Sequence, residues 1–265
     1  MNAPTDLPFM RVAAALDSYR RNLSTVAHWA DPSWSVALLG ANAAQLEPQL
    51  EHWRAALERA GAAAVQACSQ AIADAAGVKP PSFASLTQAA LKPTPAGTVQ
   101  PNAVLLDVLP VHHALQVLRM RALSFRRAEV RRLIDKRTRS QLSEWTGVGI
   151  DRLTQDAHLA DAPDIARLAA RAAMPPLTAL DAGTLAVEGC ALLLRDLGGG
   201  NPANGASGAN ESARAPFPLL RLALPRVLPT PAWLASVPHE LDASGSARLF
   251  ARLSDLLPEF AWLFG

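Results

Sequence analysis

The sequence contains little cysteine, and its two thiols lie far apart. Cys68 and Cys190 each sit in an apolar helical pattern, with no other Cys or His at the spacing of metal ligands. A disulfide framework and a structural zinc site are therefore not expected, and a reducing cytoplasm suits the chain. The first residues, MNAPTDLPFM, also lack the basic segment and the apolar run of a secretory signal peptide.

Long hydrophobic runs and aromatic residues are scarce as well. The longest apolar-biased run, 183–194, includes Glu188 and is too short to cross a bilayer. Aromatic residues make up 5% of the chain, although half of all residues are apolar. Much of that apolar share is alanine, which favours helices that pack closely together. The composition therefore predicts a mainly α fold, a helical bundle-like domain or domains.

The familiar catalytic motifs are missing. His112 and His113 are adjacent and point about 100° apart on a helix, so they do not easily share a metal ion. Gly147-Val148-Gly149 lacks the third glycine and the preceding strand of a dinucleotide site, and is typical of a helix stop. Neither a phosphate-binding lysine loop nor a GxSxG elbow occurs. We therefore expect no catalytic, cofactor-binding or metal site, although an unrecognised helical enzyme stays possible.

Hydrophobic periodicity divides the chain into two predicted regions. Residues 1–100 form an N-terminal helical region that ends in a proline-rich linker, 79–101, and residues 102–265 form a C-terminal helical region. The stretch 198–216 is rich in Gly, Asn and Ser, which predicts a flexible insertion. Leucines alternate with Arg221 and Ala223 within 217–224, which predicts a minor strand there.

Positive charge is concentrated in one stretch. Residues 119–139 hold nine Arg or Lys against Glu129 and Asp135, a net of +7. The whole chain has a formal charge of +2, so the remaining residues must total −5. The protein as a whole is therefore no polycation, and the basic block demands a local explanation.

A helical wheel separates this block into two faces. If 115–145 is treated as helical, Leu118, Phe125 and Ile134 fall on an apolar half. The opposite half is mostly basic and carries the candidate partner-binding residues Arg121, Arg127, Arg131, Arg132 and Arg139. Such a face can be merely solvated, can dock an acidic protein, or can bind nucleic acid or an anionic membrane. Stacking aromatics and a known nucleic-acid module are lacking, so we expect a protein partner.

The C-terminal decapeptide LLPEFAWLFG places three aromatic residues within the last six positions. Chain ends are usually polar and frayed. A tail this apolar must pack into the core of the protein or into a partner. We expect the core, and we keep Trp262 and Phe264 as candidate partner contacts.

The order of these features resembles a known family. ALQVLRMRALSFRRAEVRRLI is followed by GTLAVEGCALLLRDL, then by LLRLALP, by Trp233, and by the closing LLPEFAWLFG. This arrangement is similar to the K component of bacterial type III secretion systems, the SctK/YscK-like family, and within it to the Hrp branch. The resemblance is strongest over residues 105–265.

The resemblance implies a non-enzymatic scaffold in the cytoplasm, at the base of the secretion apparatus. Members of the family belong to the sorting platform beneath the injectisome, where they connect the cytoplasmic domain of the inner-membrane ring protein to the C-ring-like pod protein. The pods in turn carry the stator and the export ATPase. The alternative from the residues alone is a regulator that binds nucleic acid through its basic helix.

Overall fold

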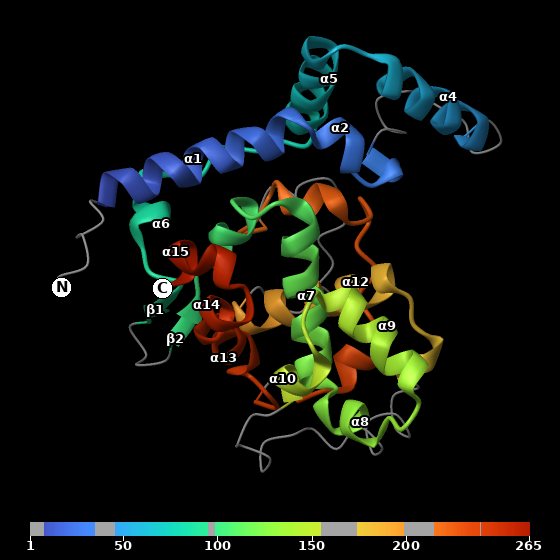
Figure 1. Cartoon of the computed structure of the whole chain (residues 1–265), viewed down its shortest axis with the longest axis vertical. Helices are drawn as coiled ribbons and strands as arrows, with labels where there is room; N and C mark the ends of the chain where they lie inside the picture. Colours follow the sequence, from blue (N-terminus) through green and yellow to red (C-terminus); the bar gives the residue numbers. More distant parts are fainter. Residues whose placement is uncertain (1–7, 35–45, 95–98, 155–173, 199–214, 239) are drawn as a thin grey trace. The chain divides into compact units, whose positions relative to one another are not determined.

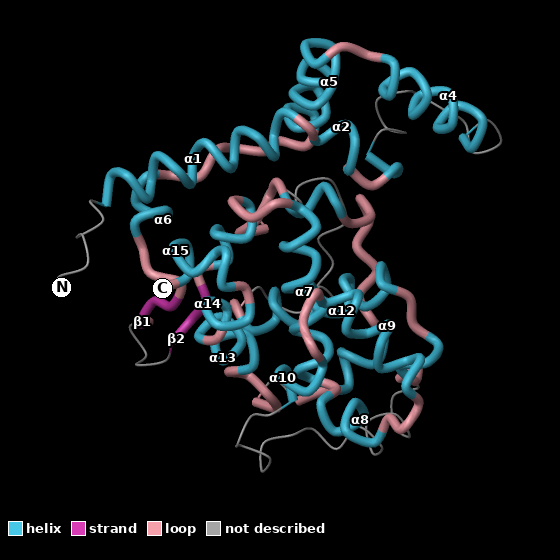
Figure 2. Tube along the Cα trace, viewed as in Figure 1, coloured by secondary structure: helices cyan, strands magenta, loops and turns pink. Residues whose placement is uncertain are grey.

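The computed structural model describes residues 8–34, 46–94, 99–154, 174–198, 215–238 and 240–265. Nearly all of their regular structure is helical, and Figure 2 shows the strands of these residues as one short pair. The predicted mainly α fold class is confirmed. The predicted flexible insertion, 198–216, lies almost entirely outside the described residues and stays a prediction.

The chain forms two compact units that alternate along the sequence. The first contains residues 1–88, 103–111 and 207–228, and the second contains residues 89–102, 112–206 and 229–265. Each unit thus takes segments from both sides of residue 100. The predicted division into the regions 1–100 and 102–265 stays a prediction.

The described part of the first unit consists of helices near the N-terminus and two 3-10 turns from later segments (Figure 1). Its elements are α1 (Pro8–Ser24), α2 (Val26–Trp29), α4 (Leu46–Arg59), α5 (Ala62–Ala75), α6 (Phe83–Thr87) and the 3-10 turns η2 (Ala103–Asp107) and η6 (Leu220–Ala223). Tyr19 of α1, Val26 of α2, Leu57 of α4 and Ile72 of α5 are buried in one hydrophobic cluster. The core of this unit is therefore a junction of the N-terminal helices.

The strand predicted at 217–224 is wrong, because this segment forms the 3-10 turn η6. Leu219, Leu220, Arg221 and Leu222 are all buried, so the expected alternation of faces is absent. The cause is Asp107, whose carboxylate accepts hydrogen bonds from the backbone N–H of Leu220, at 2.7 Å, and of Leu219, at 3.2 Å. A carboxylate that takes two successive N–H groups caps a helical turn and removes donors that a strand would share with a neighbour.

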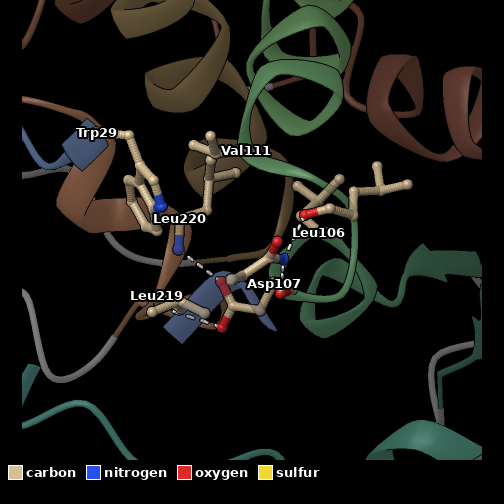
Figure 3. Close-up of a pocket in the computed structure, with 8 residues that line it drawn as sticks. Trp29, Leu106, Asp107, Val111, Leu219 and Leu220 are labelled. Atoms are coloured by element: carbon tan, nitrogen blue, oxygen red, sulfur yellow. Dashed lines mark hydrogen bonds between the residues drawn. The ribbon is translucent and has the colours of Figure 1, made fainter. Parts of the chain in front are cut away.

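Figure 3 shows how Asp107 meets this turn, in a small pocket that also includes Trp29 and Val111. Burial raises the pKa of the Asp107 carboxyl to about 7, although the N–H groups of Leu220 and Leu219 act in the opposite direction by stabilising the carboxylate. The group is protonated more readily in the folded chain than in the unfolded one, where an aspartate has a pKa of about 3.9.

This difference in pKa predicts how stability depends on pH. The contribution of Asp107 is fully present below about pH 4 and is lost as the pH rises to about 7, at roughly 1.4 kcal/mol per pH unit within that window. Asp107→Asn does not titrate and should lack this slope. Chemical unfolding of both proteins between pH 4 and pH 8 measures the difference. The exposed carboxylate of Asp17 provides the control, because Asp17→Asn should keep the slope. Equal slopes in wild type and Asp107→Asn would contradict the assignment.

The second unit gathers the remaining described elements. They are β1 (Leu91–Pro93), β2 (Val99–Pro101), α7 (Val111–Phe125), α8 (Arg127–Arg132), α9 (Lys136–Thr146), α10 (Ile150–Thr154), η4 (Leu177–Ala179), α12 (Ala182–Asp196), η7 (Ala232–Ser236), α13 (Gly245–Ala251), α14 (Leu253–Leu256), η8 (Pro258–Phe260) and α15 (Ala261–Phe264). Helix α12 is buried from Leu185 to Leu193 and is the central helix of this unit.

Two close contacts hold α12 in place. The ring of Phe125, at the end of α7, stacks on Trp233 with 5.5 Å between centroids, in a cluster that includes Leu192. At Gly189 the backbones of α12 and α7 approach so closely that a Cβ atom would lie 1.8 Å from the carbonyl oxygen of Leu118. Only glycine permits this approach.

The strands lie in the stretch that the sequence predicted as a loop. β1 and β2 pair antiparallel, with Leu91 opposite Pro101 and Pro93 opposite Val99. Both prolines sit at strand ends, where a missing N–H costs little. The pair also contacts α13 of the same unit.

Candidate protein-binding surface

The basic block is not one helix. α7 ends at Phe125, α8 ends at Arg132, and α9 begins only at Lys136. Leu133 is extended, with φ −69° and ψ 113°, and Asp135 caps α9 by accepting hydrogen bonds from the N–H groups of Arg137 and Thr138. Each new helix starts with its own orientation. A single helical wheel drawn through 115–145 therefore cannot assign residues on both sides of a break to the same face.

Arg121 lies inside the second unit and is only 1% exposed. Its guanidinium donates to Asp196 at 2.8 Å, to Asp242 at 2.9 Å and to the hydroxyl of Ser246 at 2.8 Å. Both carboxylates are themselves buried. The arginine therefore ties α7 to the end of α12 and to the start of α13, and charge-assisted bonds of this kind are strong when every group is paired.

Arg127 and Arg126 are buried as well. Arg127 donates to Asp242 at 3.3 Å and so joins the Arg121 cluster. Arg126 makes a bidentate pair with Glu188 of α12, at 2.8 and 2.9 Å, and its guanidinium lies 5.8 Å from the ring centroid of Trp233. The indole N–H of Trp233 donates to the same carboxylate at 3.3 Å.

The predicted exposure of Arg121 and Arg127 is therefore wrong. Both positions were assigned to the solvated half of a continuous helix, but they face buried carboxylates from α12 and from the turn at Asp242. Ile134, assigned to the apolar half, is 92% exposed because it lies in the gap between α8 and α9. In this unit Arg121 and Arg127 are buried and Ile134 is exposed, which is the reverse of what the helical wheel assigned.

The exposed cations of residues 119–139 lie at the end of α8 and the start of α9. We call this surface the basic corner and define it by Arg131, Arg132, Ile134, Lys136 and Arg137, all of which are exposed. Arg131 and Arg132 close α8, and Lys136 and Arg137 open α9. Within the described ranges, no ion-pair partner is found for Arg132, Lys136 or Arg137.

Arg139 and Arg131 connect the basic corner to α10. Arg139 forms an ion pair with Asp151 at 2.6 Å and also donates to the carbonyl of Leu133. Arg131 donates to the carbonyl of Thr154, at the end of α10. Of the five arginines predicted to bind a partner, Arg131 and Arg132 thus lie in the basic corner, Arg139 lies beside it, and Arg121 and Arg127 lie in the interior.

The C-terminal tail packs mainly into the second unit. Leu263 is 1% exposed and Phe264 is 7% exposed, and the ring of Phe264 meets Phe250 of α13 edge to face. Trp262 is 39% exposed. The expectation that the tail packs into the core holds for Leu263 and Phe264, while Trp262 keeps a surface that a partner can reach.

The histidine pair has a packing environment. His113 lies edge-on to Phe260, and its Nε2 is 3.4 Å from a carboxylate oxygen of Glu259. Partial burial, followed by the neighbouring His112, lowers the pKa of His113, and Glu259 opposes them. In the parts of the chain that the structure describes, no cluster of three or more His, Cys, Asp or Glu could hold a metal ion, and no helix is long and apolar enough to cross a membrane.

Sequence reasoning missed the acidic partners of the buried arginines. Asp196, Asp242 and Glu188 are distant from the basic block along the chain and carry no motif. Two signals pointed to them: the net −5 outside the block, and the presence of Glu188 within an otherwise apolar helix. A carboxylate in such a position needs a buried cation.

Comparison with known proteins gives one match. A sequence model of the family described as "Bacterial type III secretion protein (HrpB4)" matches residues 8–259, nearly the whole chain. No curated protein and no solved structure matches the chain.

Proposed function

The chain belongs to the HrpB4 family of bacterial type III secretion proteins, and from this premise we propose that it is a non-enzymatic adaptor of the secretion apparatus. It links the inner-membrane ring to the C-ring and ATPase sorting platform, on the cytoplasmic side of the membrane. The family match over residues 8–259 is the observation that carries the proposal. The earlier resemblance to the K component of the sorting platform supplies the specific role.

The surface of the second unit supports an adaptor role. Exposed contacts on a rigid framework favour binding, because less conformational entropy is lost when a partner arrives. The buried clusters of Arg121 and Arg126 provide such a framework, and the basic corner and Trp262 provide exposed contacts. Charge on an exposed surface chiefly sets orientation and association rate.

The proposed partners are the C-ring-like pod protein and the cytoplasmic domain of the inner-membrane ring protein, with the stator and the export ATPase reached through the pod. The alternative, a regulator that binds nucleic acid, finds less support in the structure. Of the nine cations in residues 119–139, only Arg131, Arg132, Lys136 and Arg137 are exposed. Affinity for nucleic acid grows with the number of phosphates that a surface can neutralise.

Co-purification tests the adaptor function directly. The tagged full-length chain is co-expressed with the pod protein and, separately, with the cytoplasmic domain of the ring protein from the same secretion system. We expect each to co-elute with the chain on size exclusion. Absence of both complexes, together with sub-micromolar binding to a short DNA duplex in physiological salt, would contradict the proposal and favour the regulator.

A further inference from the structure

Ile134 is the most exposed large apolar side chain among the described residues, at 92%. A single exposed isoleucine is ordinary on a protein surface. This one, however, is flanked in the sequence by Arg132 on one side and by Lys136 and Arg137 on the other, all of them exposed. An exposed apolar side chain with cations close to it along the chain suits a protein interface, where a central contact excludes water and a charged rim orients the partner.

The basic corner is also held in one conformation. Arg139 fixes the carbonyl of Leu133, Arg131 fixes the carbonyl of Thr154, and the carboxylate of Asp135 accepts from the N–H groups of Arg137 and Thr138 and from the Thr138 hydroxyl. Ile134 is therefore presented on a braced backbone and not on a free loop. A surface ordered before binding loses less conformational entropy when a partner arrives.

We propose that the basic corner is a docking site for an acidic protein surface that carries a small apolar pocket, with Ile134 in the pocket and the surrounding cations paired with carboxylates. This inference rests on the adaptor function proposed above and assigns it a surface. Four exposed cations against Asp135 leave the corner with a net charge of +3. The partner that fits is thus acidic around the contact and apolar at its centre.

The chemistry of the corner favours a protein over other polyanions. The corner contains three arginines and one lysine, but a guanidinium fork matches a phosphate as well as a carboxylate, so Ile134 makes the distinction. A duplex is bound through its phosphates, and a membrane surface would use Trp, Phe or Leu on an amphipathic helix. Ile134 stands alone at a short turn, where a shaped pocket suits it better than either.

Replacement of Ile134 by lysine separates these partners. Ile134→Lys keeps a long side chain and adds positive charge, so it removes the apolar contact and strengthens attraction to any polyanion. We expect this variant to bind the pod protein or the ring domain about tenfold more weakly than wild type. Arg132→Glu with Arg137→Glu should weaken the same complex and reduce its salt dependence. The melting temperature should not change, because these side chains are exposed.

Val227 provides a matched control. It is a β-branched residue next to Arg226, it is 84% exposed, and it lies in the other unit. Val227→Lys should bind both secretion partners as wild type does. Binding is measured by titration calorimetry with the purified pod protein, the purified ring domain, a short DNA duplex, and vesicles of phosphatidylserine and phosphatidylcholine.

The outcomes distinguish the docking site from the adaptor function. If the wild type binds a secretion partner and Ile134→Lys binds it equally well, the docking site is refuted and the adaptor function stands. If neither secretion partner binds the wild type, the adaptor function is refuted and the docking site with it. If Ile134→Lys gains affinity for DNA or for the vesicles while its affinity for the protein partner is unchanged, the corner binds a polyanion and the proposal is wrong.

Discussion

Arg121→Ala should unfold the second unit or lower its melting temperature by about 10 °C or more. The substitution removes the guanidinium that bridges the buried carboxylates of Asp196 and Asp242. Asp196 keeps Arg195, and Asp242 keeps Arg127 and Arg248. Removal of one partner from a buried ion pair costs about 3–5 kcal/mol when no other cation remains, so the remaining arginines favour the lower end of that range. Total stabilities of about 5–15 kcal/mol cannot absorb much of this. Thermal unfolding followed by circular dichroism measures the effect.

Two further variants separate charge from packing. Arg132→Ala removes an arginine from the exposed part of the same block and should stay within about 0.5 kcal/mol of wild type. Arg121→Met and Arg127→Met combined with Asp196→Asn and Asp242→Asn remove the buried charges together and should recover part of the loss. Asn suits position 242, where φ is +59°. A single variant Arg121→Ala with the stability of wild type would show that the cluster does not hold the fold.

Deletion of residues 261–265 should cost at least about 4 kcal/mol. The deletion removes Leu263 and Phe264, which are both buried, with Phe264 against Phe250 of α13, and truncation of one such side chain to alanine already costs about 2–5 kcal/mol. The shortened protein should melt early or aggregate. Urea unfolding of the soluble fraction gives the free energy of unfolding directly.

Trp262→Ala is the control within the same helix. Trp262 is 39% exposed, so its removal should destabilise the protein far less than the deletion does. A deletion that leaves stability unchanged but removes one secretion partner would show that the tail is a docking element and that its burial does not matter for the fold. Loss of a partner in Trp262→Ala alone would identify its exposed side as a second contact.

Local patterns predicted the helices well where a cap and a periodic face agree. Asp181 caps α12 through the N–H of Thr184, and Gly147, typical of a helix stop, ends α9 with φ +70°. The strand prediction at 217–224 failed because the conformation of this segment depends on Asp107, which is more than 110 positions away in the chain. An alternating pattern of leucines cannot report a cap supplied from such a distance.

The exposure predicted for Arg121 and Arg127 in the basic block failed for a related reason. A wheel drawn through 115–145 assumes one axis, and the breaks at Arg126 and at Leu133–Asp135 give three. The helical wheel also predicts that every arginine on its polar half is exposed to solvent. A buried guanidinium requires carboxylates, and the local sequence does not contain them. Asp196 and Asp242 come from other segments. The wheel placed Arg131 and Arg132 on the exposed side, and both are exposed, although Arg127 of the same helix is buried.

Mapping of arginine reactivity in the free and the partner-bound protein tests most directly whether the basic block has a buried structural half and an exposed docking half. A dicarbonyl reagent modifies accessible guanidinium groups, and peptide mass spectrometry locates the modified residues. In the free protein, Arg132 and Arg137 should react and Arg121 and Arg126 should not, and binding of the secretion partner should protect Arg132 and Arg137. Rapid modification of Arg121 in the folded protein, or equal modification of Arg132 and Arg137 in the complex, would contradict this division.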